Sequence, residues 1–75
     1  MTEVRMPKPG DAITEAILTT VLVPNGATVA EGQPLYEIET YKVDMQIDAP
    51  AGGVVQWQVE VGGTYDVGAL LAVIE

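Results

Sequence analysis

The chain has 75 residues, a formal net charge of −8 and a pI near 4.1. This length allows one small domain with a single core, so we treat residues 1–75 as one domain. The negative charge argues against binding nucleic acid or an anionic membrane by charge. No apolar run reaches the length of about 18 residues expected of a membrane span.

Three residue types that carry much of protein chemistry, Cys, His and Ser, are missing from the chain. The usual nucleophiles, imidazole bases and zinc ligands are therefore unavailable, and no Thr is paired with a base. We expect no catalytic residue, no metal site and no enzyme acting alone. A phosphopantetheine carrier is also excluded, because it needs a serine. The lack of disulfides is compatible with a reducing cytoplasm.

In chain order, short β-branched segments alternate with Gly and Pro turns. Residues 13–23 are too rich in Ile, Thr and Val to favour a helix, and Pro24-Asn25-Gly26 ends them with a turn signal. Residues 54–61 alternate apolar and polar side chains, as a half-buried strand does. The pattern predicts an all-β sandwich or flattened barrel without helices. The expected strands are residues 4–7, 13–23, 28–29, 35–40, 43–48, 54–61, 65–67 and 70–74.

Residues 35–47 form an extended stretch longer than one ordinary strand, so we fold it into a hairpin. A loop at Tyr41-Lys42 gives one largely apolar and one largely acidic face, with Lys42 at the tip. A loop at Thr40-Tyr41 would keep the same faces, so the pattern leaves the tip open. The apolar pairs are Thr40–Val43, Ile38–Met45 and Tyr36–Ile47. The pairs on the other face are Glu39–Asp44, Glu37–Gln46 and Leu35–Asp48.

The second half of the chain repeats the first after a shift of 36 positions. The shift predicts two similar sheets related by a pseudo-two-fold axis. It matches residues 35–39 with residues 71–75 of the final strand. The hairpin tip and the chain end should therefore lie at opposite ends of the domain. The matched pairs include Gly26 with Gly62, Thr28 with Thr64, Gly32 with Gly68, Leu35 with Leu71 and Ile38 with Ile74.

Four segments in order resemble the biotinyl/lipoyl-attachment family, and its lipoyl domains in particular, over essentially the whole length. Residues 6–15 resemble the family's opening strand and loop, and residues 23–29 its V-x-x-G-x-x-V turn. Residues 37–43, Glu-Ile-Glu-Thr-Tyr-Lys-Val, resemble the lipoylation hairpin, usually Glu-x-Glu-Thr-Asp-Lys-Ala/Val. Residues 49–55 resemble the A-P-x-x-G-x-V step. Each segment alone is weakly specific, but four in order are specific.

The resemblance implies a flattened barrel of two four-stranded antiparallel sheets and lipoate attached to Lys42 as an amide. The domain would be a non-catalytic, monomeric part or partner of a dihydrolipoamide acyltransferase, in the cytoplasm or mitochondrial matrix. Its arm would swing between the active sites of a 2-oxo acid dehydrogenase complex. The implied partners are lipoate-protein ligase, the thiamine-dependent dehydrogenase, the acyltransferase catalytic domain and dihydrolipoamide dehydrogenase, with no nucleic acid and no membrane.

Residues around Lys42 bear on recognition. Tyr41 and Val43 flank it, and Tyr41 stands where the family commonly has Asp, which predicts altered recognition by the dehydrogenase or shielding of the arm. A second departure, Ala16 in place of a common Gly, is expected to be tolerated. Acidic residues on the hairpin are expected to be its solvent face, where they would steer basic partners. The recognition candidates among them are Glu37, Glu39 and Asp44.

Two alternatives keep the same fold. A biotin carrier would hold biotin on Lys42, but biotin domains typically flank the lysine with Met, and here the flanks are Tyr41 and Val43. An unmodified, lipoyl-like interaction module would lack a presented lysine and carry a helical hairpin at the tip. The short turn between Thr40 and Val43 argues against that module.

Overall fold

The computed structural model describes the whole chain, Met1–Glu75, as eight strands with no helix. This confirms the predicted all-β class and the number of strands. The strands are β1 (Thr2–Arg5), β2 (Glu15–Val21), β3 (Thr28–Val29), β4 (Pro34–Glu39), β5 (Asp44–Asp48), β6 (Gly53–Trp57), β7 (Thr64–Asp66) and β8 (Leu70–Ile74).

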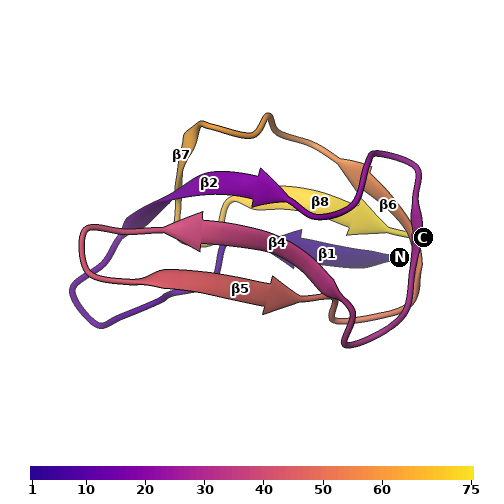
Figure 1. Cartoon of the computed structure of the whole chain (residues 1–75), viewed down its shortest axis with the longest axis horizontal. Helices are drawn as coiled ribbons and strands as arrows, with labels where there is room; N and C mark the ends of the chain where they lie inside the picture. Colours follow the sequence, from indigo (N-terminus) through magenta and orange to yellow (C-terminus); the bar gives the residue numbers. More distant parts are fainter.

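The strands form two four-stranded antiparallel sheets, one in the order β1-β8-β6-β3 and the other in the order β5-β4-β2-β7 (Figure 1). One apolar cluster draws buried side chains from both sheets, so the sheets share a single core. Its largest fully buried members are Tyr36, Met6, Leu18, Leu35, Ile38, Leu71, Ile74 and Val55. The predicted flattened barrel of two sheets is therefore confirmed.

The internal repeat is visible in the topology. A shift of 36 positions carries β2, β3 and β4 onto β6, β7 and β8, and it maps the order β4-β2-β7 onto β8-β6-β3. Of the six repeated strands, each sheet therefore holds two from one repeat and one from the other. Strands β1 and β5 complete the sheets as edge strands. The turn glycines agree: Gly26 and Gly62 have φ of 87° and 93°, and Gly32 and Gly68 have φ of 85° and 90°. Only glycine adopts this left-handed region readily.

Two predicted strands are longer than those in the structure. The segment 13–23 forms a strand only over Glu15–Val21, and the segment 54–61 only over Gly53–Trp57. The cause in the second case is a change of sheet. Gln58 N still donates to Leu71 O, but Gly62 N donates to Leu18 O in the opposite sheet. The chain crosses between these points, and Val61 is 52% exposed instead of following the apolar face.

The hairpin register agrees with the prediction at four of its pairs, which are Tyr36–Ile47, Ile38–Met45, Glu37–Gln46 and Glu39–Asp44. The predicted Leu35–Asp48 pair is wrong. Asp48 pairs with Pro34, and the register shifts between Pro34 and Tyr36. Leu35 is the extra residue of this bulge, and it is fully buried instead of lying on the acidic face. A bulge adds one residue to a strand, so it can turn into the core a side chain that strict alternation would place on the outer face.

Tyr36 and Trp57 join the two repeats. Their rings meet edge to face, with centroids 6.0 Å apart and planes at 90°. Trp57 Nε1 donates to Val23 O at 3.1 Å, and its backbone N donates to Asn25 Oδ1 at 2.7 Å. Burial raises the pKa of the Tyr36 phenol from 10.0 to about 12, because the phenolate would lose its hydration.

The turn between β4 and β5 lies at one end of the molecule, and both termini lie at the other (Figure 1). This confirms the arrangement that the repeat predicts. The β4–β5 tip is therefore remote from any chain that would continue beyond Met1 or Glu75.

Candidate functional site

The β4–β5 tip is a two-residue turn, Tyr41-Lys42, closed by the side chain of Thr40. The Thr40 hydroxyl accepts hydrogen bonds from Lys42 N at 3.2 Å and Val43 N at 3.0 Å, and it donates to Val43 O at 3.1 Å. Thr40 N also donates to Val43 O at 2.8 Å. One hydroxyl thus satisfies the backbone of a tip that contains no glycine. No non-glycine residue has positive φ, so this is not a primed hairpin turn.

Lys42 stands at the end of this turn with an exposed side chain. Its Nζ lies 5.7 Å from the ring centroid of Tyr41, within the range of a cation–π contact. Tyr41 is 76% exposed and Val43 is 41% exposed. The amine is therefore open to solvent between the two predicted flanking residues, and the Tyr41 ring lies within cation–π range of it.

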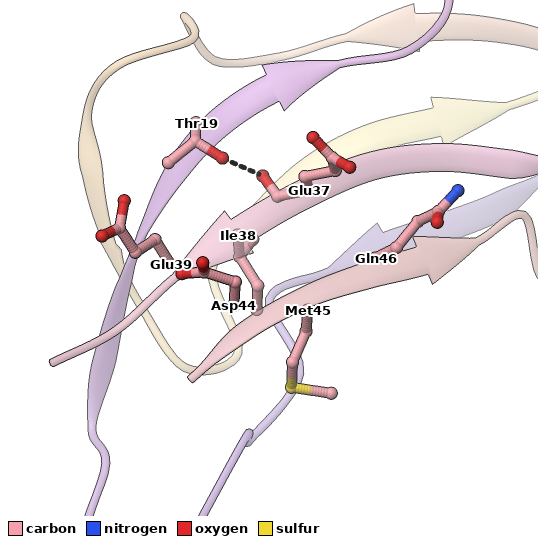
Figure 2. Close-up of a pocket in the computed structure, with 7 residues that line it drawn as sticks. All are labelled: Thr19, Glu37, Ile38, Glu39, Asp44, Met45 and Gln46. Carbon is pink, nitrogen blue, oxygen red and sulfur yellow. Dashed lines mark hydrogen bonds between the residues drawn. The ribbon is translucent and has the colours of Figure 1, made fainter. Parts of the chain in front are cut away.

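An acidic hollow lies on the outer face of β4 and β5 (Figure 2). Glu39 and Asp44 form a directly opposed pair, and Glu37 is opposed to Gln46. Thr19 Oγ1 on β2 donates to Glu37 O at 3.2 Å. All three predicted recognition carboxylates thus lie on one face. Like charges that are directly opposed on a sheet repel, and a basic partner would relieve that repulsion.

A second hollow, of about 390 Å³, lies beside the tip on the outer face of β2, β4 and β7. We call it the tip hollow; its lining residues are Glu15, Ile17, Glu39, Thr40, Tyr41 and Thr64. Pairing in the sheet explains its composition, because Ile17 is opposed to Glu39 on one side and to Thr64 on the other. Ile17 is 39% exposed on this outer face.

Sequence reasoning missed Ile17, Thr64 and Glu15 as neighbours of the tip. One signal was present, because Ile17 and Leu18 are consecutive apolar residues of a strand, so one of them has to face outward. The neighbours of Ile17 on β7 could not be predicted from the sequence. Strand β7 belongs to the second repeat, yet it pairs with β2 of the first repeat.

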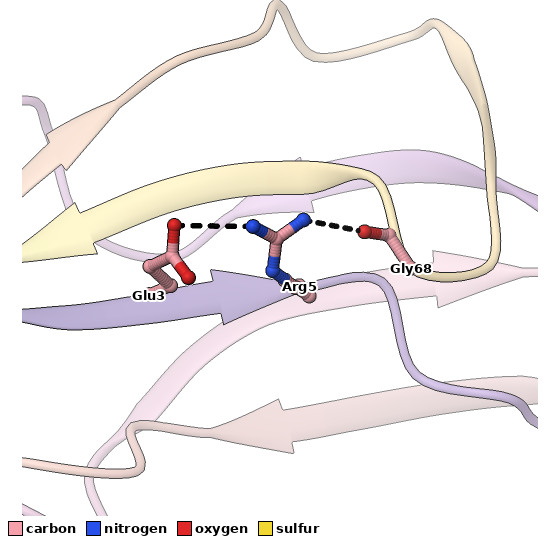
Figure 3. A network of polar contacts seen from close by, with 3 residues as sticks. All are labelled: Glu3, Arg5 and Gly68. Carbon is pink, nitrogen blue, oxygen red and sulfur yellow. Dashed lines mark hydrogen bonds and ion pairs between the residues drawn. The ribbon is translucent and has the colours of Figure 1, made fainter.

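The other cationic side chains differ from Lys42. Arg5 Nη1 donates to Gly68 O at 2.9 Å, and Arg5 Nη2 pairs with Glu3 Oε2 at 3.1 Å (Figure 3). Arg5 therefore ties β1 to the turn before β8. Lys8 is exposed in the loop between β1 and β2. Lys42 is the lysine that a tight hairpin turn presents.

No group of three or more His, Cys, Asp or Glu side chains is arranged to hold a metal ion. No helix long and apolar enough to cross a membrane is present.

A duplicated β-barrel that presents an exposed lysine on a hairpin turn is the arrangement expected of a prosthetic-group carrier domain. The family described as "Biotin-requiring enzyme", which covers biotin and lipoyl attachment, matches residues 2–75. The chain belongs to this biotin/lipoyl attachment family.

Three relatives illustrate the range of the family. The chain is 42% identical over 72 residues to the dihydrolipoyllysine-residue acetyltransferase component of the pyruvate dehydrogenase complex of Corynebacterium glutamicum, covering 95% of this chain and 11% of that protein. It is 37% identical over 75 residues to the succinyltransferase component of the 2-oxoglutarate dehydrogenase complex of Bartonella vinsonii, covering 99% and 18%. It is 34% identical over 73 residues to acetyl-CoA carboxylase of Saccharomyces cerevisiae, covering 97% and 3%. The chain thus spans less than a fifth of the length of these relatives.

Proposed function

We propose that residues 1–75 are a lipoyl carrier domain and that Lys42 is the residue to which lipoate is attached. The observation that carries the proposal is the position of Lys42, which is exposed on a tight turn at the end of the barrel opposite both termini. The similarity to dihydrolipoyllysine-residue acyltransferases supports lipoate as the group attached.

The residues of the tip fit an amide-linked group. A primary amine is the nucleophile that an activated carboxyl group needs, and the Thr40 hydrogen bonds hold the turn that carries it. The modifying enzyme has to supply the activated carboxyl group. When bound, lipoate would supply the acyl-carrying and redox chemistry. The chain itself would position and present it, without a catalytic role.

Charge supports a set of partners with basic docking surfaces. Glu37, Glu39 and Asp44 surround the base of the tip on a chain with net charge −8. Such a surface favours encounter with positively charged partners and repels acidic ones. We propose lipoate-protein ligase, a thiamine-dependent 2-oxo acid dehydrogenase, an acyltransferase domain and dihydrolipoamide dehydrogenase as those partners, in the cytoplasm or the mitochondrial matrix.

A biotin carrier is the second candidate. The similarity to a yeast acetyl-CoA carboxylase and the description of the family favour it. Tyr41 and Val43 beside the lysine, in place of Met, favour lipoate over biotin.

The deciding experiment measures intact mass after incubation with ATP and either lipoate and lipoate-protein ligase or biotin and biotin ligase. We expect one lipoyl increment on the parent and on Lys8→Ala, and none on Lys42→Ala. Lys8 is the matched control because it is the other exposed lysine. A biotin increment alone would establish the second candidate. An increment that survives in Lys42→Ala would remove Lys42 from its proposed role.

A further inference from the structure

We propose that the tip hollow seats the uncharged arm attached to Lys42, with Tyr41 as its wall and Ile17 as its apolar floor. This inference rests on the proposed function. It adds a bound state of the arm and assigns a positioning role to Tyr41 and Ile17.

The first observation is the tether. Lys42 Nζ lies 5.7 Å from the centroid of the Tyr41 ring, and Tyr41 also lines the tip hollow. An acyl group on Nζ therefore begins next to a residue that lines the hollow, although Lys42 itself does not line it. Acylation turns the ammonium into a neutral amide, so the cation–π contact is lost and the ring face becomes available to the methylene chain.

The second observation is exposed apolar surface. Ile17 and Tyr41 are among the few large apolar side chains that the fold leaves exposed, at 39% and 76%. They line the same hollow although they are distant in the sequence. Its volume, about 390 Å³, is within the range of roughly 300–1,000 Å³ that is typical of small-molecule clefts.

Charge selects the occupant. Glu15 and Glu39 line the hollow, and Asp66 is opposed to Glu15 on β7. An anionic group in this hollow would be repelled, whereas a neutral dithiolane and methylene chain would not. The same carboxylates disfavour an acyl cargo that ends in a free carboxylate. We therefore expect the seated state to hold neutral forms of the arm.

Binding in such an open hollow is compatible with a mobile arm. A short flexible tether gives an effective concentration in the millimolar range. A hollow that binds free lipoamide with a millimolar Kd would then hold the tethered arm for a substantial fraction of the time and release it readily. Tyr41 and Ile17 would set that fraction without touching the reacting sulfur atoms of the free arm.

The test uses ¹⁵N- and methyl-labelled chain, lipoylated at Lys42 and verified by intact mass, beside the unmodified chain and Lys42→Gln. We expect lipoylation to shift the Ile17 methyl and Thr64 amide signals, with nuclear Overhauser contacts between the Tyr41 ring and the arm. Lys42→Gln, which loses the charge but carries no arm, should leave Ile17 and Thr64 unchanged. Tyr41→Ala should lower the seated fraction by roughly twofold to tenfold, and Tyr41→Phe should retain it.

A titration of the unmodified chain with free lipoamide separates this inference from the proposed function, because it needs no ligase. Millimolar binding that shifts Ile17 and Thr64 and is weakened in Tyr41→Ala would support the hollow even if no lipoyl increment forms. If lipoylation shifts only residues 40–44 and the arm signals are equally sharp in Tyr41→Ala, the arm is free and the inference is wrong. Absence of lipoamide shifts at millimolar concentration would likewise overturn it.

Discussion

The two repeats build the same scaffold, but only the first carries the candidate site. Strand β4 and its counterpart β8 bury equivalent side chains: Leu35 and Leu71 are fully buried, and Ile38 and Ile74 are each 1% exposed. The strands differ at their C-terminal ends. Strand β4 continues into the Thr40–Val43 turn, whereas β8 ends at the pole where the termini lie. The proposed function therefore depends on the segment Thr40–Val43 after β4 and not on the scaffold that the two repeats share.

The similarity extends to an irregularity. In the β4–β5 pair, Leu35 has no partner between Pro34 and Tyr36. In the β8–β1 pair, Ala72 is opposed to Val4 and Leu70 to Arg5, so Leu71 has no partner either. The bulge therefore recurs at equivalent positions of the two repeats. In each case it directs a leucine into the core from an interior strand, at the point where that strand pairs with the edge strand of its sheet.

The largest expected effect tests the equivalence of these bulges. Leu35→Ala and Leu71→Ala should each lower the free energy of unfolding by about 2–5 kcal/mol, because both leave a cavity in a shared core. Urea unfolding monitored by Trp57 fluorescence measures both losses. The comparison predicts losses of similar size; a large loss at one leucine and a small one at the other would show that the repeats are not energetically equivalent.

Much of the fold was predictable from the sequence because alternation, turn residues and the repeat are local or periodic signals. The Leu35 position was not, because a bulge breaks the alternation on which the hairpin pairing depends. The repeat would have shown that Leu35 and Leu71 share an environment, but not which environment. At the tip, the positions of Lys42 and of the neighbouring carboxylates were predictable from the pairing of one hairpin. The tip hollow was not, since Ile17 and Thr64 meet Glu39 only when β2 pairs with β4 and β7.

Alkaline pH should break the symmetry between the repeats, because Tyr36 in the first repeat corresponds to Ala72 in the second. The folded pKa of Tyr36 is about 12, against 10.0 for the free phenol. Its stabilising contribution is fully present below pH 10 and is lost as pH rises toward 12, since the unfolded chain releases the proton first. The loss should reach about 2–3 kcal/mol at most.

Unfolding free energies between about pH 9 and pH 12, with ultraviolet absorbance to monitor phenolate formation, measure this effect. Tyr36→Phe should remove most of the decline with pH. Tyr41→Phe is the matched control, because its ring is 76% exposed, and it should keep the decline. A parental pH profile in Tyr36→Phe would assign the alkaline sensitivity to another group.

The turn that distinguishes β4 from β8 should depend on one hydroxyl. Thr40→Val keeps the shape of the side chain but removes the bonds to Lys42 N, Val43 N and Val43 O. We expect a loss of about 1 kcal/mol, faster amide exchange at positions 42 and 43, and slower modification of Lys42. Thr19→Val is the control on the neighbouring strand, since its hydroxyl makes a single bond to Glu37 O. Equal exchange rates in the two variants would deny Thr40 its special role.

The smallest effect concerns the acidic face of the β4–β5 pair, which has no counterpart on the β8–β1 pair. Glu39 and Asp44 are directly opposed, whereas the corresponding edge strand β1 carries Glu3 paired with Arg5. Asp44→Asn should stabilise the fold by about 0.2–1 kcal/mol, more at low salt than at high salt, because it removes a like-charge pair. Urea unfolding at two ionic strengths measures the gain. The same substitution should slow association with a basic partner, so stability and recognition change in opposite directions.

Asp48→Asn provides the comparison, since Asp48 is opposed to the uncharged Pro34 and should gain less. Equal gains in both variants would trace the effect to net charge and not to the opposed pair.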